Sequence, residues 1–234
     1  MAGSAPSDVA RSVAIIMDGN ARWARGRGLP VEEGHRAGTK ALRRTVEAAI
    51  DLGVGTLVVY AFSTENWSRP EAEVEDLMEI FGETIERELP DLARQGVRTR
   101  FMGRRDRAPD ELREQIERLE GETAENDRLN LWVAFDYGGR ADIVEAARRL
   151  VEEGAPPDAI DEESLRANLY APELPDPDLL IRTSGELRIS NFLLWQLAYS
   201  ELVFVDTLWP DFGRDELQQA LAAYAQRRRR FGGR

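Results

Sequence analysis

Apolar residues follow two patterns along the chain, and their alternation predicts a layered α/β domain. Short unbroken apolar runs such as residues 13–17 and 56–62 are typical of strands covered on both faces. Longer segments with apolar residues three and four apart, such as 34–52, are typical of amphipathic helices. Strands are predicted at residues 12–17, 56–62, 97–102, 129–135, 178–181 and 201–205, and helices at 34–52, 71–95, 109–125, 140–153, 161–170, 189–199 and before residue 227.

Strands that alternate with helices predict a single α/β domain with a mostly parallel six-stranded sheet and helices on both faces. Residues 1–11 are small and polar and are predicted to be a flexible tail, which leaves 12–234 as the domain. The apolar stripe on the helix at 71–95 is expected to pack in the core. If part of that helix faces a cleft, the stripe would instead line an apolar tunnel between sheet and helices.

Composition narrows the classes of protein. The chain has 234 residues, enough for one α/β domain, and a net charge of −12, which disfavours binding to nucleic acid. Cysteine is absent, which excludes disulfides, thiol catalysis and cysteine metal sites. No apolar run reaches the ~18 residues of a membrane span, and the first ten residues lack the apolar core of a secretory signal. A cytoplasmic protein is therefore expected.

The most informative polar residues follow the first predicted strand, in the sequence Asp18-Gly19-Asn20 with Arg22 close behind. In open α/β sheets, ligands bind at the carboxyl ends of the strands. A glycine lets backbone approach a ligand, and arginine suits phosphate. Since an aspartate would repel phosphate unless a cation lay between them, Mg²⁺ is inferred there. These residues are equally compatible with an ordinary strand-to-turn junction.

Two other predicted strands end in clusters of the same character, one at 63–69 and one at 182–191. Because parallel strands align their carboxyl ends, the three clusters are expected to converge on one crevice. Arginines, hydroxyls and glycines beside one aspartate suit a diphosphate with a divalent cation. The glycine patterns of dinucleotide sites and of nucleotide hydrolases are missing from the sequence. His35, the only histidine, fits either a helix cap or a donor to phosphate.

These residues form a series of motifs that resembles the cis-prenyltransferases, most closely bacterial undecaprenyl diphosphate synthase, over residues 12–233. The motifs are Ile15-Ile16-Met17-Asp18-Gly19-Asn20 with Arg22-Trp23-Ala24, Gly34-His35, Tyr60-Ala61-Phe62-Ser63-Thr64-Glu65-Asn66-Trp67 with Arg69, Tyr137-Gly138-Gly139-Arg140, Ile181-Arg182-Thr183-Ser184-Gly185-Glu186 with Arg188-Ile189-Ser190-Asn191, and Leu208-Trp209-Pro210-Asp211.

The resemblance implies a Mg²⁺-dependent enzyme that adds isopentenyl diphosphate units, in Z configuration, to an allylic diphosphate such as farnesyl diphosphate. The product would be a polyprenyl diphosphate, the precursor of a lipid carrier for cell-wall sugars. The family forms homodimers, and contact with a membrane would be at most peripheral. Two alternatives remain: a non-catalytic partner subunit of the same fold, or another diphosphate-binding α/β transferase.

The resemblance also implies roles for individual residues. Asp18 would bind Mg²⁺ with help from Glu201 of the same or of the partner subunit. Asn66 is a candidate in proton removal, although an amide is a poor base and more plausibly positions a diphosphate oxygen or a water. The allylic diphosphate would be held by Gly19, Asn20, Arg22 and His35. Isopentenyl diphosphate would be bound by Arg182, Arg188 and Ser190. The remaining substrate-site residues are Ala21, Trp23, Ser63, Thr64, Glu65, Trp67, Arg69 and Ile189.

The sequence departs from the family pattern at Val31, where bacterial members usually carry a phosphate-binding arginine; Arg25 or Arg27 is a possible replacement. Ala61 is small at the head of the expected tunnel, which favours medium or long products. Residues 189–205 are too apolar for a solvent face and are assigned to core and dimer contact. The arginines at 227–230 fit a solvated helix end, or a contact with phosphate or a membrane surface.

Overall fold

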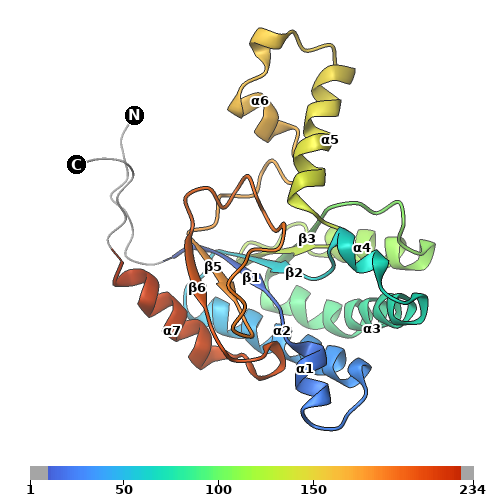
Figure 1. The fold of residues 1–234 in the computed structure, drawn as a ribbon, viewed down its shortest axis with the longest axis vertical. Coiled ribbons are helices and arrows are strands. Elements are labelled where there is room, and N and C mark those ends of the chain that lie inside the picture. Colours follow the sequence, from blue (N-terminus) through green and yellow to red (C-terminus); the bar gives the residue numbers. More distant parts are fainter. Residues whose placement is uncertain (1–9, 228–234) are drawn as a thin grey trace.

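The computed structural model describes residues 10–227, apart from the side chain of Leu89, and a six-stranded sheet lies at its centre (Figure 1). The strand order is β3-β4-β2-β1-β5-β6, and every neighbouring pair is parallel. The strands are β1 (Ser12–Ile16), β2 (Thr56–Tyr60), β3 (Val97–Met102), β4 (Leu129–Ala134), β5 (Leu179–Arg182) and β6 (Glu201–Phe204). The predicted parallel α/β sheet is confirmed.

The α-helices agree with the sequence pattern except at two places. They are α1 (Asn20–Arg25), α2 (Val31–Asp51), α3 (Glu71–Gln95), α4 (Asp110–Glu122), α5 (Gly139–Glu152), α6 (Glu162–Ala167) and α7 (Arg214–Ala225), with short 3-10 turns η1 (Thr64–Ser68), η2 (Pro157–Ala159) and η3 (Trp209–Asp211). The sequence pattern did not predict α1. None of these 3-10 turns was predicted, and η1 lies in the polar cluster at 63–69. The helix predicted at 189–199 is absent.

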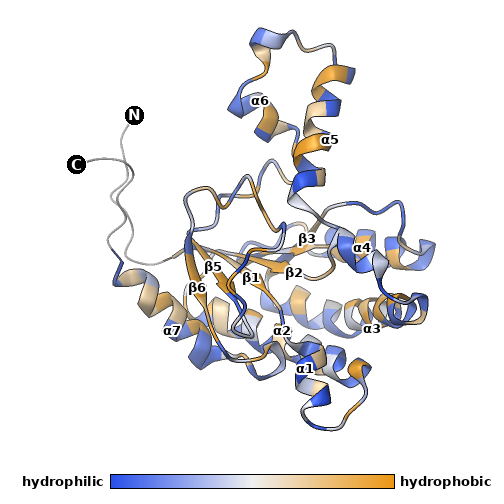
Figure 2. Ribbon diagram, viewed as in Figure 1, coloured by the Kyte–Doolittle hydropathy of each residue, from blue (hydrophilic) through white to orange (hydrophobic). Residues whose placement is uncertain are grey.

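Strand residues alternate between two apolar layers. Val13 and Ile15 of β1 join the layer that packs against α2, α3, α4 and α7, whereas Ala14 and Ile16 point to the opposite layer. Figure 2 shows the strands as predominantly hydrophobic ribbons, as expected for strands covered on both faces. This first layer holds most of the core, and it is the one that contains the candidate tunnel.

The second face of the sheet is covered largely by non-helical chain. Phe192, Leu193 and Leu197 are buried against it, while α5 leads away from the sheet toward α6 (Figure 1). The helix predicted at 189–199 was wrong because Ser190, Asn191 and Leu193 take positive φ angles of 47°, 62° and 45°, which an α-helix cannot accommodate. The apolar spacing there serves packing onto the sheet instead.

The chain is already held at the first described residues. Ala10 is buried, and the backbone N–H of Arg11 donates to the Asp178 carboxylate at 2.9 Å, so the tail predicted over 1–11 does not include these two positions. The rest of that tail, and Arg228 to Arg230 of the basic run, lie outside the described residues. Within 10–227, no helix combines the length and apolar character needed to cross a membrane.

Candidate active site

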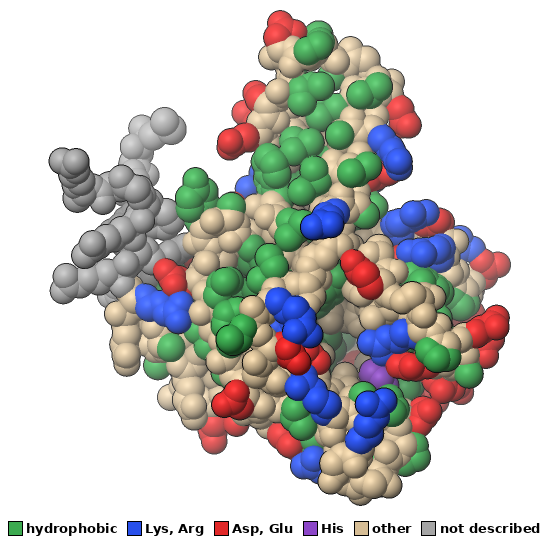
Figure 3. Space-filling view, viewed as in Figure 1, with side chains coloured by type: hydrophobic (Ala, Val, Ile, Leu, Met, Phe, Trp, Pro, Cys, Tyr) green, Lys and Arg blue, Asp and Glu red, His purple; other side chains and the backbone are tan. Residues whose placement is uncertain are grey.

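The carboxyl end of β1 lies where the strand order reverses. The chain goes from β1 to β2 on one side, and β5 later pairs with β1 on the other. Such a point opens a crevice at the carboxyl edge of the sheet. In the space-filling view, Lys and Arg side chains surround a hollow beside the single histidine (Figure 3). The predicted convergence of strand-end clusters takes place here.

Asp18 and Arg182 form the centre of this site. Arg182 Nη2 donates to Asp18 Oδ2 at 2.9 Å, and Arg22 Nη2 lies 3.4 Å from Asp18 Oδ1. The Arg182 side chain is only 4% exposed, whereas that of Asp18 is 29% exposed. Arg182 also donates to Ser190 Oγ at 2.7 Å and to the Arg188 carbonyl. The guanidinium is therefore fixed in position, and the carboxylate remains open to a ligand.

The charge on Asp18 is stabilised by its neighbours. Partial burial would raise the pKa of its carboxyl group, but the hydrogen bond from Arg182 and the charges of Arg182 and Arg22 outweigh that effect and lower it. Asp18 is consequently ionised throughout the neutral range. An ionised carboxylate beside two guanidinium groups can bind a cation while the arginines bind an anion.

Two glycines explain how this backbone is placed. Gly19 has φ of 114°, and a Cβ there would lie 2.9 Å from Leu208 Cδ2. Gly38 of α2 packs against Asn20, because a Cβ at Gly38 would lie 2.6 Å from Asn20 Oδ1. The oxygen Asn20 Oδ1 is buried and has no partner among the described residues, which suits a polar ligand in the crevice.

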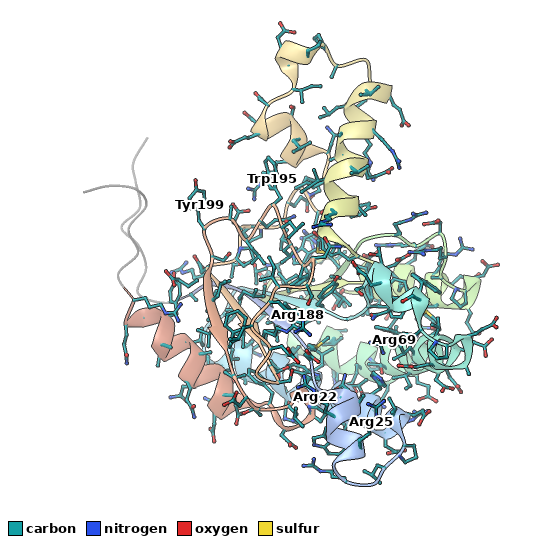
Figure 4. All side chains as sticks on the ribbon, viewed as in Figure 1. Arg22, Arg25, Arg69, Arg188, Trp195 and Tyr199 are labelled. Carbon is teal, nitrogen blue, oxygen red and sulfur yellow. The ribbon has the colours of Figure 1, made fainter. Side chains whose placement is uncertain are left out.

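The loop after β5 contacts Arg22 and supplies one further arginine, Arg188. Arg22 donates to the Ser184 carbonyl at 3.1 Å and to its hydroxyl, and lies 3.6 Å from Glu186 Oε1. Arg188 pairs with Glu186 and is largely exposed. Arg22, Arg69 and Arg188 come from three segments and lie around the same opening, while Trp195 and Tyr199 lie away from it (Figure 4). Ile189 packs onto the second face of the sheet.

The segment after β2 is tied to this loop. Asn191 Nδ2 donates to Glu65 Oε1 at 2.9 Å, and Thr64 Oγ1 donates to Glu65 Oε2 at 3.1 Å. Burial would raise the pKa of Glu65, but these hydrogen bonds lower it. Asn66 Oδ1 accepts the Ser63 N–H at 2.8 Å, so the amide N–H₂ is the part of Asn66 that a ligand can use.

His35 lies at the start of α2, on the wall of an apolar cavity. Burial and the positive charge of Arg69 lower the pKa of His35, with Glu73 and Glu32 opposing. Its Nε2 is buried without a partner among the described residues. A neutral imidazole there can donate an N–H to an incoming anion. The negative charge of that anion would also favour protonation of the imidazole. Arg69 itself pairs with Glu73 at 2.7 Å.

The cavity has a volume of about 140 Å³ and extends from the strand ends into the layer between the sheet, α2 and α3. Met17, Asn20 and Ala61 line its head. Its walls are mainly apolar and include Leu77, Ile80, Phe81, Phe101, Leu131 and Val133. A charged crevice that opens onto an apolar cavity matches an amphiphile with an anionic head. The tunnel predicted between sheet and helices is present.

Asp18 fits a magnesium ion that is shared with a substrate. Among residues 10–227, no group of three or more acidic or histidine side chains could hold a metal unaided. Mg²⁺ characteristically keeps several waters and is bound through one or two carboxylates together with substrate phosphates. The single ionised carboxylate of Asp18, beside guanidinium groups, satisfies that pattern.

Two predicted residues do not join this cluster within one chain. Glu201 begins β6 opposite Leu179, at the other end of the strand from Arg182, and pairs with Arg227 at 2.7 Å. A role for Glu201 beside Asp18 therefore requires a second subunit. Trp23 donates from its indole N–H to Asp211 at 2.7 Å and stacks under Arg27, outside the cavity.

Sequence reasoning did not assign roles to two residues that build the site. Thr183 accepts the Asp18 N–H at 2.8 Å and donates to the Asp18 carbonyl, which fixes the backbone of the aspartate. Asn191 holds Glu65 and accepts the Arg140 N–H at 2.9 Å. Both lie in motifs noticed in the sequence, but the contacts join segments far apart in the chain and leave no local signal.

Residues 16–232 match the model of a protein family described as putative undecaprenyl diphosphate synthase. The chain is 52% identical over 231 residues to isoprenyl transferase 2 of Bradyrhizobium diazoefficiens, covering 97% of this chain and 92% of the relative. It is 51% identical over 230 residues to a ditrans,polycis-undecaprenyl-diphosphate synthase ((2E,6E)-farnesyl-diphosphate specific) of Xanthomonas oryzae pv. oryzae, covering 97% and 89%.

Two solved structures of prenyl diphosphate synthases have the same fold as this chain. The lavandulyl diphosphate synthase from Lavandula x intermedia, crystallised with dimethylallyl diphosphate, superposes with a TM-score of 0.92 at 39% identity, covering 96% of this chain and 99% of that one. A probable undecaprenyl diphosphate synthase from Campylobacter jejuni superposes with a TM-score of 0.81 at 32% identity, covering 95% and 98%.

Proposed function

The chain belongs to the undecaprenyl diphosphate synthase family of isoprenyl transferases, which are enzymes, and from that premise we propose that it condenses isopentenyl diphosphate onto an allylic diphosphate such as farnesyl diphosphate. The observation that carries the proposal is the Asp18–Arg182 pair at the head of an apolar cavity. We propose residues 12–234 as one catalytic domain. The products would be polyprenyl diphosphates of Z configuration that serve as lipid-carrier precursors for cell-wall sugars.

The residues around the crevice divide between two diphosphates. Arg22, His35 and the backbone at Gly19 and Asn20 would hold the allylic diphosphate, since they surround the head of the cavity that would take its tail. Arg182, Arg188 and Ser190 would hold isopentenyl diphosphate, since Arg182 already joins Ser190 and the Arg188 backbone to Asp18. Arg27 is engaged with Asp211 and Trp23, so Arg25 is the better substitute for the arginine replaced by Val31.

The reaction breaks the allylic C1–O bond, and the diphosphate leaves with the electron pair. The terminal alkene carbon of isopentenyl diphosphate bonds to C1, and a proton is lost from its C2. This yields inorganic diphosphate and a chain longer by one isoprene unit. The arginines stabilise the charge that develops on the leaving group. When bound at Asp18, Mg²⁺ would supply Lewis-acid assistance to that departure.

Asn66 would position the proton acceptor. Its side-chain oxygen is used by the Ser63 N–H, which leaves only its N–H₂ for a ligand. A donor fits a diphosphate oxygen or a water that takes the proton, and the amide would not itself act as the base.

A homodimer is part of the proposal. Tyr199 is 76% exposed and lies just before β6, the strand at one end of the sheet order, whose Leu202 is also exposed. Such a face is suited to a second copy, which would also be needed to bring a Glu201 to the magnesium site. We further propose a cytoplasmic enzyme, with peripheral membrane contact at most. A monomer by light scattering at micromolar concentration would contradict the dimer.

Incubation with Mg²⁺, farnesyl diphosphate and labelled isopentenyl diphosphate tests the function. We expect labelled polyprenyl diphosphates, and none when EDTA replaces Mg²⁺. Absence of elongated product would contradict the proposal, and the finding that product forms only after a related subunit is added would identify a non-catalytic partner.

A further inference from the structure

The far end of the cavity differs from its walls, because its lining includes charged side chains. Along α3 the lining runs from Leu77 through Ile85 to Glu88 and Asp91, and Arg43 faces them from α2. At 1.5 Å per residue, Leu77 and Asp91 are about 21 Å apart along the helix axis. The charged group therefore lies well away from Asp18 and near the far end of the cavity, where only Leu92 and Gln95 of α3 line it further on.

Arg43 joins the two helices at this end. Arg43 Nη1 lies 3.4 Å from Glu88 Oε2, and Arg43 Nη2 lies 2.5 Å from Asp91 Oδ2. Arg43 also pairs with Glu47 of its own helix at 3.2 Å. Glu88 and Asp91 have second partners, Arg87 and Arg94, but both belong to α3. Among the ion pairs of the described residues, those of Arg43 alone connect α2 to α3 at the cavity.

The two carboxylates are mostly buried and the arginine is half-exposed, so the group forms a polar barrier that can move. The Glu88 side chain is 12% exposed and that of Asp91 23%, whereas Arg43 is 43% exposed. An apolar chain pushed past them would strip water from charged groups, which is unfavourable. The arginine, however, is exposed enough to swing outward with the ions still partly solvated.

The last turns of α3, beside this group, lack one backbone hydrogen bond. Pro90 lies inside the helix, directly before Asp91. Proline has no N–H, so the Glu86 carbonyl loses its normal hydrogen bond and the helix is weakened there. The helix continues past Pro90 to Gln95 with one backbone hydrogen bond fewer, and the Arg43–Asp91 pair ties this weakened turn to α2.

We propose that the Arg43–Glu88–Asp91 group is a latch across the end of the cavity that sets the length of the product, a proposal that rests on the proposed polyprenyl synthase activity. At each length the enzyme either adds another unit or releases the chain. When the tail reaches the latch, further growth must displace these side chains. Growth then becomes slower than release of the product. Weakening the latch shifts the partition toward growth.

Arg43→Leu tests the latch. It removes the link while Glu88 and Asp91 keep Arg87 and Arg94. Glu47 also loses its pair with Arg43, but its side chain is 47% exposed and stays solvated. The expected result is a shift of the main products to longer chains, with the ratio of growth to release at the wild-type length rising on the order of tenfold, as a change of 1.36 kcal/mol in relative barrier produces. Arg43→Lys keeps the charge and is expected to stay close to the wild-type distribution.

Arg36→Leu is the matched control. Arg36 pairs with Glu83 across the same two helices, but neither residue lines the cavity. Chain lengths are read by chromatography of the products from farnesyl diphosphate, with thermal unfolding to check the fold. An Arg43→Leu distribution equal to wild type or shorter overturns the latch, as does lengthening in Arg36→Leu. If Arg43→Leu proves unfolded, Asp91→Asn must lengthen products or the latch is rejected. Lack of any elongation by the wild type would instead refute the proposed function.

Discussion

The two ends of the cavity both hold arginine–carboxylate pairs, but the pairs differ in what surrounds them. At the head, Arg182 is 4% exposed and has three acceptors that fix it next to Asp18. At the far end, Arg43 is 43% exposed and spans two helices. The buried pair is suited to preorganised chemistry, which needs donors that do not move. The exposed pair is suited to a boundary that can open.

The energetics of the two pairs follow from the same contrast. Breaking a buried ion pair by removing one partner costs ~3–5 kcal/mol, because the other charge stays buried and uncompensated. Pairs exposed to solvent typically contribute ~0–1 kcal/mol. Variants at the head are therefore expected to change both rate and stability, and variants at the far end chiefly the length of the product.

The largest expected effect is at Asp18. Asp18→Asn removes the charge that would hold Mg²⁺ while an amide oxygen can still accept from Arg182. Since a metal contributes several kcal/mol to such a transition state and 1.36 kcal/mol is tenfold in rate, kcat should fall on the order of 10³-fold. Steady-state assay measures it, and Asp51→Asn, an exposed carboxylate paired with Arg214, is the control.

Stability separates the two possible changes at this position. Asp18→Ala should also lower the free energy of unfolding, because the buried Arg182 guanidinium loses its carboxylate partner, whereas Asp18→Asn should be milder. Full activity in Asp18→Asn would contradict the assignment of the head of the cavity as the catalytic end.

The next effect is a change of product rather than of rate. Ala61 lines the head of the cavity just after β2. Ala61→Leu adds volume there, so the tail meets an obstacle early and the main products should shorten, with the first addition of isopentenyl diphosphate little affected. Chromatography of the products measures this, and Ala61→Ser, nearly the same size, should keep the wild-type profile. An unchanged profile in Ala61→Leu would show that the chain does not follow this cavity.

The residues at the head of the cavity could be predicted from the sequence, whereas those at the far end could not. The strands were predicted closely because buried parallel strands are continuous apolar runs bounded by polar residues, and Asp18 and Arg182 were found because they follow such runs. The helix at 189–199 was mispredicted because its apolar spacing reflects contact with the sheet and not helical backbone. Arg43 carried no signal at all, since its role depends on α2 and α3 lying side by side.

The smallest expected effect concerns His35, at the head of the cavity. Its folded-state pKa is lowered, mainly by burial and by Arg69, so the unfolded chain binds more protons than the folded one as pH falls below about 6.5. The contribution to stability is complete above that pH and is lost as pH falls toward the folded-state pKa.

Since His35 is the only histidine, His35→Gln should flatten the dependence of unfolding free energy on pH between pH 7.5 and 5.5. Urea titrations at the two pH values measure it. Inorganic diphosphate should reduce the loss at low pH in the wild type, because an anion beside the imidazole favours its charged form, and should have less effect on His35→Gln. Equal pH dependence in the two proteins, with and without diphosphate, would remove His35 from the head-group site and leave the arginines as the only residues assigned to grip the allylic diphosphate by charge.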